Sequence, residues 1–276
     1  MWDQTLLRFY FGLVGLLLEL FLSPSAWAAL PSKSFLVVVD PGHGGSDVGS
    51  IGRLPPRKGV KKVDIYEKDL TLKLARRVGK FLKDPALAKI AGKPIRVEFT
   101  RNSDKSLSLD KRAEIVKRKR PDLFISVHLN SEESGTARGF ETYILNNTTP
   151  ESNEHVERLG ARRAPLEKGK ERELSILLSS LSADSMVGDS KKAAQAIQTG
   201  IAAQSQRDKI DLSDRGLRQS LLQVLLDAQS PAVLVEGAFL SNPEDLEIAI
   251  STKAQDSLAR GIATGAARYL NQALKK

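Results

Sequence analysis

Two of the three histidines in this sequence follow apolar, β-branched segments and are well placed to bind a metal ion. His43 lies in a glycine-rich corner after Val37–Val39, and His128 directly follows Leu123–Val127. A side chain at the end of a strand points into a crevice that loops can line, so imidazoles there suit metal or proton chemistry. The alternatives are a tight turn that needs glycine around His43 and a satisfied core or edge histidine at position 128.

Two glutamates complete a set that could carry hydrolytic chemistry. Glu67 stands at the start of a predicted helix, although a plain first-turn charge is the alternative reading. Glu236 follows Ala232–Val235, and a carboxylate there needs a partner because desolvation opposes its ionised form. If His43, Glu67 and His128 converge, they form the three-ligand set of a catalytic zinc site with an open fourth position. Glu236 is then the candidate general base that takes a proton from water.

The composition limits which residues could bind a metal ion and which binding partners suit the chain. The 276 residues include no cysteine, so a transition-metal site must use imidazole and carboxylate ligands. His155 lies in a charged segment typical of a solvated helix face, and we leave it out of the site. The net charge of +9 suits a polyanionic partner such as an acidic cell-wall polymer or an anionic lipid surface. We expect no nucleic-acid partner, because the chain begins with an export signal.

Residues 1–28 have the form of a secretory signal peptide. Arg8 precedes an apolar run over residues 9–22, and Ala26–Ala28 has the small-x-small form of a cleavage site. The run is short for a membrane span, so we expect cleavage after Ala28 and no stable membrane span afterwards. Glu19 within the run favours the alternative, an uncleaved anchor. Cleavage removes two acidic residues and one basic residue, which leaves a net charge of +10.

Residues 29–276 are long enough for one sizeable core, and no linker or repeat divides them. Apolar segments alternate with helical patterns, which is typical of a layered α/β fold. Strands are expected at Phe35–Asp40, Ile95–Thr100, Leu123–Val127, Phe140–Leu145 and Ala232–Glu236. Helices are expected at Asp69–Lys83, Leu107–Lys119, Ser190–Gln206 and Ala254–Leu274.

Four segments, taken in order, resemble the signature blocks of zinc-dependent N-acetylmuramoyl-L-alanine amidases of bacterial cell-wall turnover. They are VVVDPGHGG, YEKDLTLKLA, FISVHLNS and PAVLVEGAFLSNPEDLE, within a match from residue 35 to about 272. The resemblance implies a three-layer α/β/α domain with a central mixed, mostly parallel sheet. It implies one zinc ion per chain and cleavage of the amide between N-acetylmuramic acid and L-alanine in peptidoglycan. Its zinc ligands would be His43, Glu67 and His128, and its catalytic residue Glu236.

Three further residues are candidates for positioning the site or contacting substrate. Asp40 would orient His43 through a hydrogen bond, or would simply form the turn before Pro-Gly. Asn130 would contact substrate, or would cap its own loop. Arg101 lies in Thr100–Asp104, which resembles another block of the family, as does Asp214–Leu217.

Residues of about 148–189 form an insert relative to the shortest family members. Within it, Glu173–Leu181 can form a helix with a leucine-rich face. The insert is similar to that of division-associated Gram-negative amidases, in which a helix covers the zinc site until an activator with a degenerate LytM-type domain displaces it. The similarity implies a periplasmic, autoinhibited enzyme for daughter-cell separation, with Glu171 or Glu173 reaching the zinc. A surface elaboration with a satellite core is the alternative.

Two other functions remain open at this point. A zinc carboxypeptidase, or an amidase of soluble muropeptides, would keep the metal and change the bond or the substrate. A non-catalytic peptidoglycan-binding protein would keep the fold without the chemistry. The presence of all three ligand candidates and of Glu236 argues against the non-catalytic protein, because a degenerate relative should have lost at least one of them.

Overall fold

The computed structural model describes residues 34–56, 63–145, 170–226 and 228–275, with side chains in the helix that begins at Lys170 described from residue 185 onward. The predicted signal peptide and residues 148–169 of the predicted insert lie outside the described residues. The side chains of Glu171 and Glu173 also lie outside them, and so do those of the leucines of Glu173–Leu181. Within the described part, no helix is long and apolar enough to cross a membrane.

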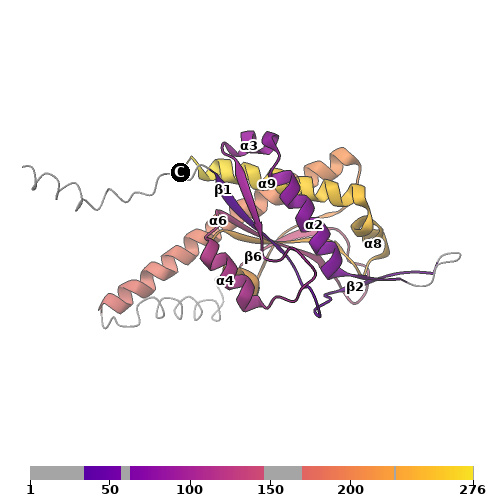
Figure 1. The fold of residues 1–276 in the computed structure, drawn as a ribbon, viewed down its shortest axis with the longest axis horizontal. Helices are drawn as coiled ribbons and strands as arrows, with labels where there is room; N and C mark the ends of the chain where they lie inside the picture. Colours follow the sequence, from indigo (N-terminus) through magenta and orange to yellow (C-terminus); the bar gives the residue numbers. More distant parts are fainter. Residues whose placement is uncertain (1–33, 57–62, 146–169, 227, 276) are drawn as a thin grey trace, which may run out of the picture. The chain divides into compact units, whose positions relative to one another are not determined.

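The described residues form a six-stranded sheet in the order β4-β1-β5-β8-β6-β7 (Figure 1). The first four strands in this order run parallel, whereas β6 pairs antiparallel with β8 and parallel with β7. The predicted mixed, mostly parallel sheet is confirmed. The strands are β1 (Phe35–Pro41), β4 (Ile95–Phe99), β5 (Leu123–Asn130), β6 (Phe140–Leu145), β7 (Asp214–Ser220) and β8 (Ala232–Phe239). A separate two-stranded ribbon pairs β2 (Ile51–Leu54) with β3 (Val63–Tyr66).

Helices flank both faces of the sheet, as the α/β/α expectation requires. Those that pack on the larger core are α2 (Glu67–Leu82), α3 (Pro85–Ala91), α6 (Lys170–Asp208) and α9 (Thr252–Ala273). The opposite face is covered by α4 (Leu109–Lys119) and the short α7 (Gln223–Leu226), whereas α8 (Pro243–Ile250) packs beside the end of β8. The second face therefore has the thinner cover among the described residues.

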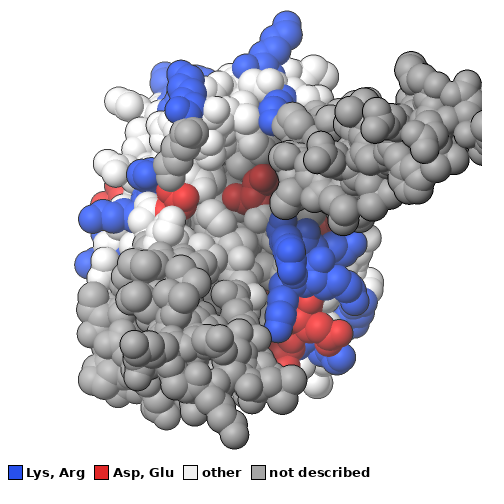
Figure 2. Space-filling view, turned by 90° about the vertical axis from the view of Figure 1, so that its left-hand side faces the viewer, with Lys and Arg blue, Asp and Glu red and all other residues white. Residues whose placement is uncertain are grey.

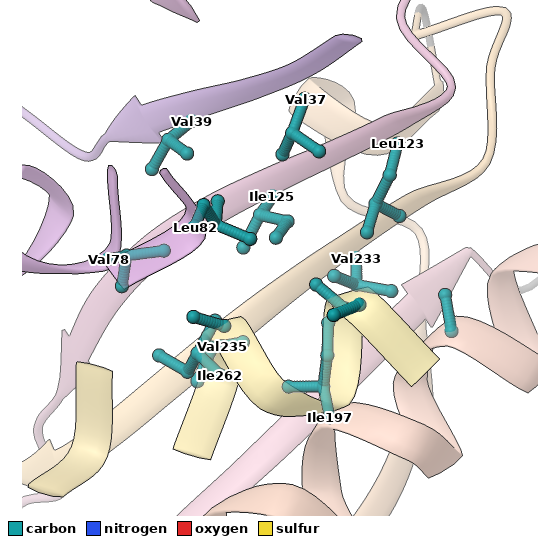
Figure 3. Packing of buried hydrophobic residues seen from close by; sticks show 14 of the residues in the cluster. Val37, Val39, Val78, Leu82, Leu123, Ile125, Ile197, Val233, Val235 and Ile262 are labelled. Atoms are coloured by element: carbon teal, nitrogen blue, oxygen red, sulfur yellow. The ribbon is translucent and has the colours of Figure 1, made fainter. Parts of the chain in front are cut away.

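Alternation along β1 explains why its sequence is continuously apolar. Val37 and Val39 pack into the larger core with residues of α2 and α9 such as Val78 and Ile262 (Figure 3). The intervening Val38 faces the smaller core under α4 and α7. A strand buried on both faces has no solvent side, so it carries no polar alternation. The same alternation directs Phe124 of β5 and Ala232 and Leu234 of β8 toward the thinly covered face.

The expected helix at Ser190–Gln206 is the second half of a much longer element. Helix α6 runs continuously from Lys170 to Asp208, so the backbone shows no break at the predicted end of the insert near residue 189. Its later part is anchored in the core by Ala193, Ile197 and Ile201, which are fully buried. The insert therefore leads directly into a core helix instead of returning through a loop.

Glycines allow α6 and α9 to pack at very short range. A Cβ added to Gly265 of α9 would lie 2.4 Å from the carbonyl oxygen of Ala196, and one added to Gly200 of α6 would lie 2.4 Å from that of Gly261. Backbone atoms cannot move aside as a flexible side chain can, so these positions exclude larger residues.

The net positive charge is evident on the molecular surface. Figure 2 shows Lys and Arg side chains gathered beside a smaller group of Asp and Glu on one face. Exposed charges also pair within single helices, as Lys111 does with Glu114 at 2.7 Å. Exposed pairs of this kind contribute only about 0–1 kcal/mol, so the buried cores dominate the stability of the fold.

Gly265→Ala should lower the free energy of unfolding by about 1–3 kcal/mol, because the added methyl group overpacks the contact with α6. Gly188→Ala is the matched control, since Gly188 is an exposed position of α6 and nothing lies within 4 Å of an added Cβ. The control should gain about 0.5–1 kcal/mol, the usual preference for alanine inside a helix. Urea unfolding measures both, and equal effects would contradict the packing argument.

Candidate metal centre and active site

Glu67 links the two histidines singled out by the sequence. Its Oε2 atom lies 3.1 Å from Nε2 of His43, and its Oε1 atom lies 3.0 Å from Nδ1 of His128. The backbone N–H groups of Ser50 and Leu129 donate to the same carboxylate at 2.8 and 3.0 Å. Each of the three side chains offers a ligand atom, and these atoms lie within 4.8 Å of one another. The structure therefore brings the three predicted ligands into one cluster that could hold a metal ion.

The glycine-rich corner gives His43 its position. His43 has a φ of +58°, a left-handed conformation that is uncommon outside glycine. A Cβ on Gly42 would lie 2.3 Å from the ring of His128, and one on Gly49 would lie 2.5 Å from Oε2 of Glu67. The glycines around the site are thus required because imidazole and carboxylate groups occupy the space that side chains would fill.

Two buried arginines hold the carbonyl groups of this corner. Arg101 is 1% exposed and donates to the carbonyl oxygens of Pro41 and Gly42 at 3.0 and 2.7 Å. Arg112 donates to those of Pro41 and His43, both at 2.8 Å. Arg101 therefore fixes the backbone of the site and is too deeply buried to contact substrate.

Asp40 does not make the hydrogen bond to His43 that the sequence suggested. Its carboxylate pairs with Arg112 and accepts hydrogen bonds from Thr100 and Ser126, the latter at 2.8 Å. It lies on β1 beneath the corner and acts as the counterion of a buried arginine. Asp47 takes the expected role, because both of its carboxylate oxygens lie 2.9 Å from Nδ1 of His43.

Glu236 lies beside the metal cluster in the sheet. It is opposite His128 in the register of β5 and β8, and opposite Glu141 in the register of β8 and β6. Its Oε2 atom is buried and has no hydrogen-bond partner among the described residues. Burial raises the pKa of Glu236 to about 7. A carboxyl group with this pKa is well suited to exchange protons near neutral pH.

Glu141 is the centre of a second polar cluster on the same side of the sheet. Asn130 and the Tyr143 hydroxyl donate to its Oε1 atom, both at 2.9 Å. Nε atoms of Arg215 and Arg218 donate to its Oε2 atom at 3.1 and 3.2 Å. Asn130, which was a candidate for substrate contact or for loop capping, thus binds Glu141 and also accepts a hydrogen bond from the N–H of Ser131 at 2.8 Å.

A cavity of about 500 Å³ opens beside the cluster on the thinly covered face of the sheet. His43, Asp47 and His128 line one part of it, and residues 106–109 and 222–224 line the rest. This size suits a ligand of several hundred daltons. The residues able to bind a metal therefore adjoin space that a substrate can occupy.

Comparison with known proteins places this arrangement in a family. The family model described as N-acetylmuramoyl-L-alanine amidase matches residues 37–268. The chain belongs to the N-acetylmuramoyl-L-alanine amidase family.

Individual relatives agree with this assignment. The chain is 27% identical to the amidase AmiC of Neisseria meningitidis over 87% of its own length and 54% of AmiC. It is 28% identical to AmiA of Escherichia coli over 86% of its length and 76% of AmiA. The crystal structure of the amidase from Clostridium difficile 630 matches with a TM-score of 0.61 and 30% identity, covering 87% of this chain and 98% of that one.

The ionisable groups of this amidase stabilise one another within the cluster. Burial opposes protonation of His43, but hydrogen bonds and charge from Glu67 and Asp47 outweigh it and raise the pKa of His43 to about 9. Burial likewise opposes protonation of His128, yet Glu67 and Glu236 raise its pKa. The two imidazoles keep the pKa of Glu67 well below its usual range despite burial. Without a metal, Glu67 is therefore an ionised carboxylate between two imidazoles that favour the charged form.

Sequence reasoning missed several residues that shape the amidase site. Asp47 lies four residues after His43 in a glycine-rich loop, and this short spacing was the available signal. Glu141 alternates with Phe140 and Thr142 along a strand, so a period of two places it on the face opposite Phe140. Arg112 carried no local signal of its role in the site, because Asp40, Pro41 and His43, which it holds there, lie 69 or more residues away in the sequence.

Asp47→Ala should weaken metal binding by about 10- to 100-fold, because a carboxylate that holds the second nitrogen of a ligand imidazole fixes its orientation. Zn²⁺ titration in competition with a chelating dye measures the effect. Asp64→Ala is a matched control, since Asp64 is an exposed carboxylate on β3 that pairs with Arg53. Equal affinities of the two variants would exclude an orienting role for Asp47.

Proposed function

We propose that this amidase is a zinc enzyme that hydrolyses the amide between the lactyl group of N-acetylmuramic acid and L-alanine in peptidoglycan. The observation that carries the proposal is the cluster of His43, Glu67 and His128 beside the buried Glu236. Peptidoglycan amidase activity is the activity of the family, and the proposal adds the metal and the roles of the residues.

The chemistry of the donor set fits zinc. Two imidazoles and one carboxylate are the ligands of many catalytic zinc sites, in which the fourth position is left for water or substrate. Asp47 would orient His43, and the N–H groups of Ser50 and Leu129 would orient Glu67. Bound zinc supplies Lewis acidity at the scissile carbonyl and a lower pKa for the attacking water.

Glu236 would transfer the proton that hydrolysis requires. Its carboxylate accepts a proton as water attacks the carbonyl carbon and the new C–O bond forms. It returns this proton to the amide nitrogen as the C–N bond breaks, so the leaving L-alanine departs as an amine. A buried carboxyl group with a pKa of about 7 suits both steps, because neither protonation state is strongly favoured near neutral pH.

The cellular setting belongs to the same proposal. A cell-wall substrate requires an extracytoplasmic enzyme, and residues 1–28 support export to the periplasm. The resemblance of the insert supports autoinhibition through Glu171 or Glu173, release by a LytM-type activator, and a role in daughter-cell separation. The continuous helix α6 connects this insert to the catalytic domain.

Glu236→Gln should lower kcat/KM by about 10²- to 10⁴-fold while zinc binding persists, because proton transfer is lost and the ligands are kept. In the wild type, kcat/KM should fall with decreasing pH, since only the ionised Glu236 accepts a proton. The midpoint should lie at or below about 7, because a bound cation favours the carboxylate. Mass spectrometry of digested sacculi provides the assay.

The stability of the metal-free protein is the control for Glu236→Gln. Burial raises the pKa of Glu236 from 4.5 to about 7, so this group makes the wild type less stable as pH rises through that interval. The variant should be more stable than the wild type at about pH 8, and the difference should vanish at low pH. Wild-type turnover by a folded variant would remove Glu236 from the mechanism.

A shortened stem still attached to muramic acid would indicate carboxypeptidase action, and free stem peptides beginning with L-alanine would indicate the amidase.

Deletion of residues 151–187 should raise the basal rate of dye release from labelled peptidoglycan, because the proposed plug is removed. Ser190, which accepts the N–H of Ala232 at 2.9 Å and so joins α6 to β8, is kept in this variant. Thermal unfolding should verify that the variant folds. An unchanged basal rate in a folded variant would indicate a surface elaboration instead of a plug.

A further inference from the structure

Arg215 and Arg218 lie on β7, the strand at one edge of the sheet, and turn toward the polar face that contains Glu236. Each uses its Nε atom to donate to Oε2 of Glu141. Their terminal Nη atoms make no hydrogen bond or ion pair with any other described residue. The side chains are 33% and 48% exposed, so the outer edges of both guanidinium groups face solvent.

The positive charge of the two arginines exceeds the negative charge of Glu141. Glu141 is 3% exposed and already accepts hydrogen bonds from Asn130 and Tyr143 at its other oxygen. Burial opposes its ionised form, but these donors and the two arginines lower the pKa of Glu141, so it is a carboxylate. One carboxylate against two guanidinium groups leaves one positive charge without a partner among these residues.

The geometry of the arginines suits an additional anion. A guanidinium group binds a carboxylate with two parallel hydrogen bonds along one edge, and Nε contacts with Glu141 leave the Nη edge available. Arg215 is also held against the ring of Phe239, with 4.9 Å between its Cζ atom and the ring centroid. The side chain is thus fixed on two sides before a ligand arrives, which lowers the entropic cost of binding.

The register places this charge at a defined distance from the reacting bond. His128, Glu236 and Glu141 are neighbours across β5, β8 and β6, and β7 follows next. With strands about 4.8 Å apart, β7 lies about 10 Å from β8. The cavity beside His43 and His128 is lined by residues of β1, α4, α7 and β8 but by neither arginine, and in the register of the sheet the arginines lie beyond Glu236 and Glu141 from His128.

We propose that Arg215 and Arg218 form a carboxylate subsite for the stem peptide, on the side of the scissile amide that leaves with L-alanine. The inference rests on the proposed amidase function and names the part of the substrate that each side of the site receives. A spacing of about 10 Å suits the carboxylate of the residue after L-alanine, since one intervening residue spans about 3.5 Å and the arginine side chains reach inward. The cavity then receives the muramic acid side.

Two soluble muropeptides that differ only in amidation of that carboxylate test the subsite. The full-length wild type should cleave the acidic muropeptide with a kcat/KM about 10- to 100-fold above that of the amidated one, through a lower KM, because one charge-assisted interaction is lost on amidation. Arg218→Gln should remove most of this preference, so that the kcat/KM of the acidic muropeptide falls toward that of the amidated one. Arg218→Lys should recover part of the preference.

Arg260→Gln is the matched control. Arg260 of α9 also lies over a phenylalanine ring, with 4.3 Å between Cζ and the centroid of Phe81, but it is on the helix that packs against the opposite face. It should keep the full preference for the acidic muropeptide. The comparison separates the subsite from a general loss of positive charge.

Calorimetric binding of the free stem peptide, in acidic and amidated forms, provides a readout independent of hydrolysis. Charge-dependent binding that is lost in Arg218→Gln supports the subsite even if neither muropeptide is cleaved, a result that would refute only the proposed function. Equal binding and equal cleavage of the two forms by the wild type would overturn the subsite. A uniform loss on both substrates in Arg218→Gln would also overturn it and assign Arg218 to support of Glu141. If Arg218→Gln fails to fold, the comparison of the two substrates with the wild type still decides.

Discussion

The need to satisfy the buried carboxylate of Glu67 organises this structure. An ionised carboxylate that is 3% exposed is strongly unfavourable unless every lone pair has a partner. Two imidazoles and two backbone N–H groups supply these partners from three segments other than the one that carries Glu67. The first turn of α2, the end of β5, the loop before β2 and the glycine corner must therefore be in place together. The fold and the metal-binding cluster therefore depend on the same contacts.

A second tier of buried charge supports this arrangement. Arg101 and Arg112 satisfy carbonyl groups that an irregular corner leaves without strand partners, and Asp40 neutralises Arg112. Arg101, Arg112 and Asp40 beneath the corner are thus buried, whereas the arginines beside Glu141 remain partly open. This division allows the corner to be rigid while the opposite side of the site stays free to accept a substrate.

Most of the fold and the centre of the site could be predicted from the sequence, because both rest on patterns within single segments. Continuous apolar runs identified the buried strands, and strand ends followed by histidine or glutamate identified the groups that converge. The long α6 was predicted as two separate helices, Glu173–Leu181 and Ser190–Gln206, because the polar residues between them interrupt the apolar pattern. The ribbon of β2 and β3 is short and mostly exposed, so it has little hydrophobic pattern. Asp40 was a candidate for orienting His43 and Asp47 was missed, because the role of Asp40 depends on Arg112, which reaches it from a distant helix.

The left-handed backbone of His43 has a consequence for how this site can change over evolutionary time. A non-glycine residue at φ +58° is strained, and glycine or asparagine would adopt the same conformation more readily. Once the imidazole is no longer needed, substitutions at position 43 are therefore biased toward residues that adopt this backbone conformation without strain. A descendant that kept the fold, abandoned hydrolysis and also replaced Glu67 would be expected to gain stability by this replacement, because no buried carboxylate would then lose the imidazole as a partner. A histidine that is retained here is consequently a sign of continued selection for chemistry. Core residues such as Val38 cannot provide such a sign.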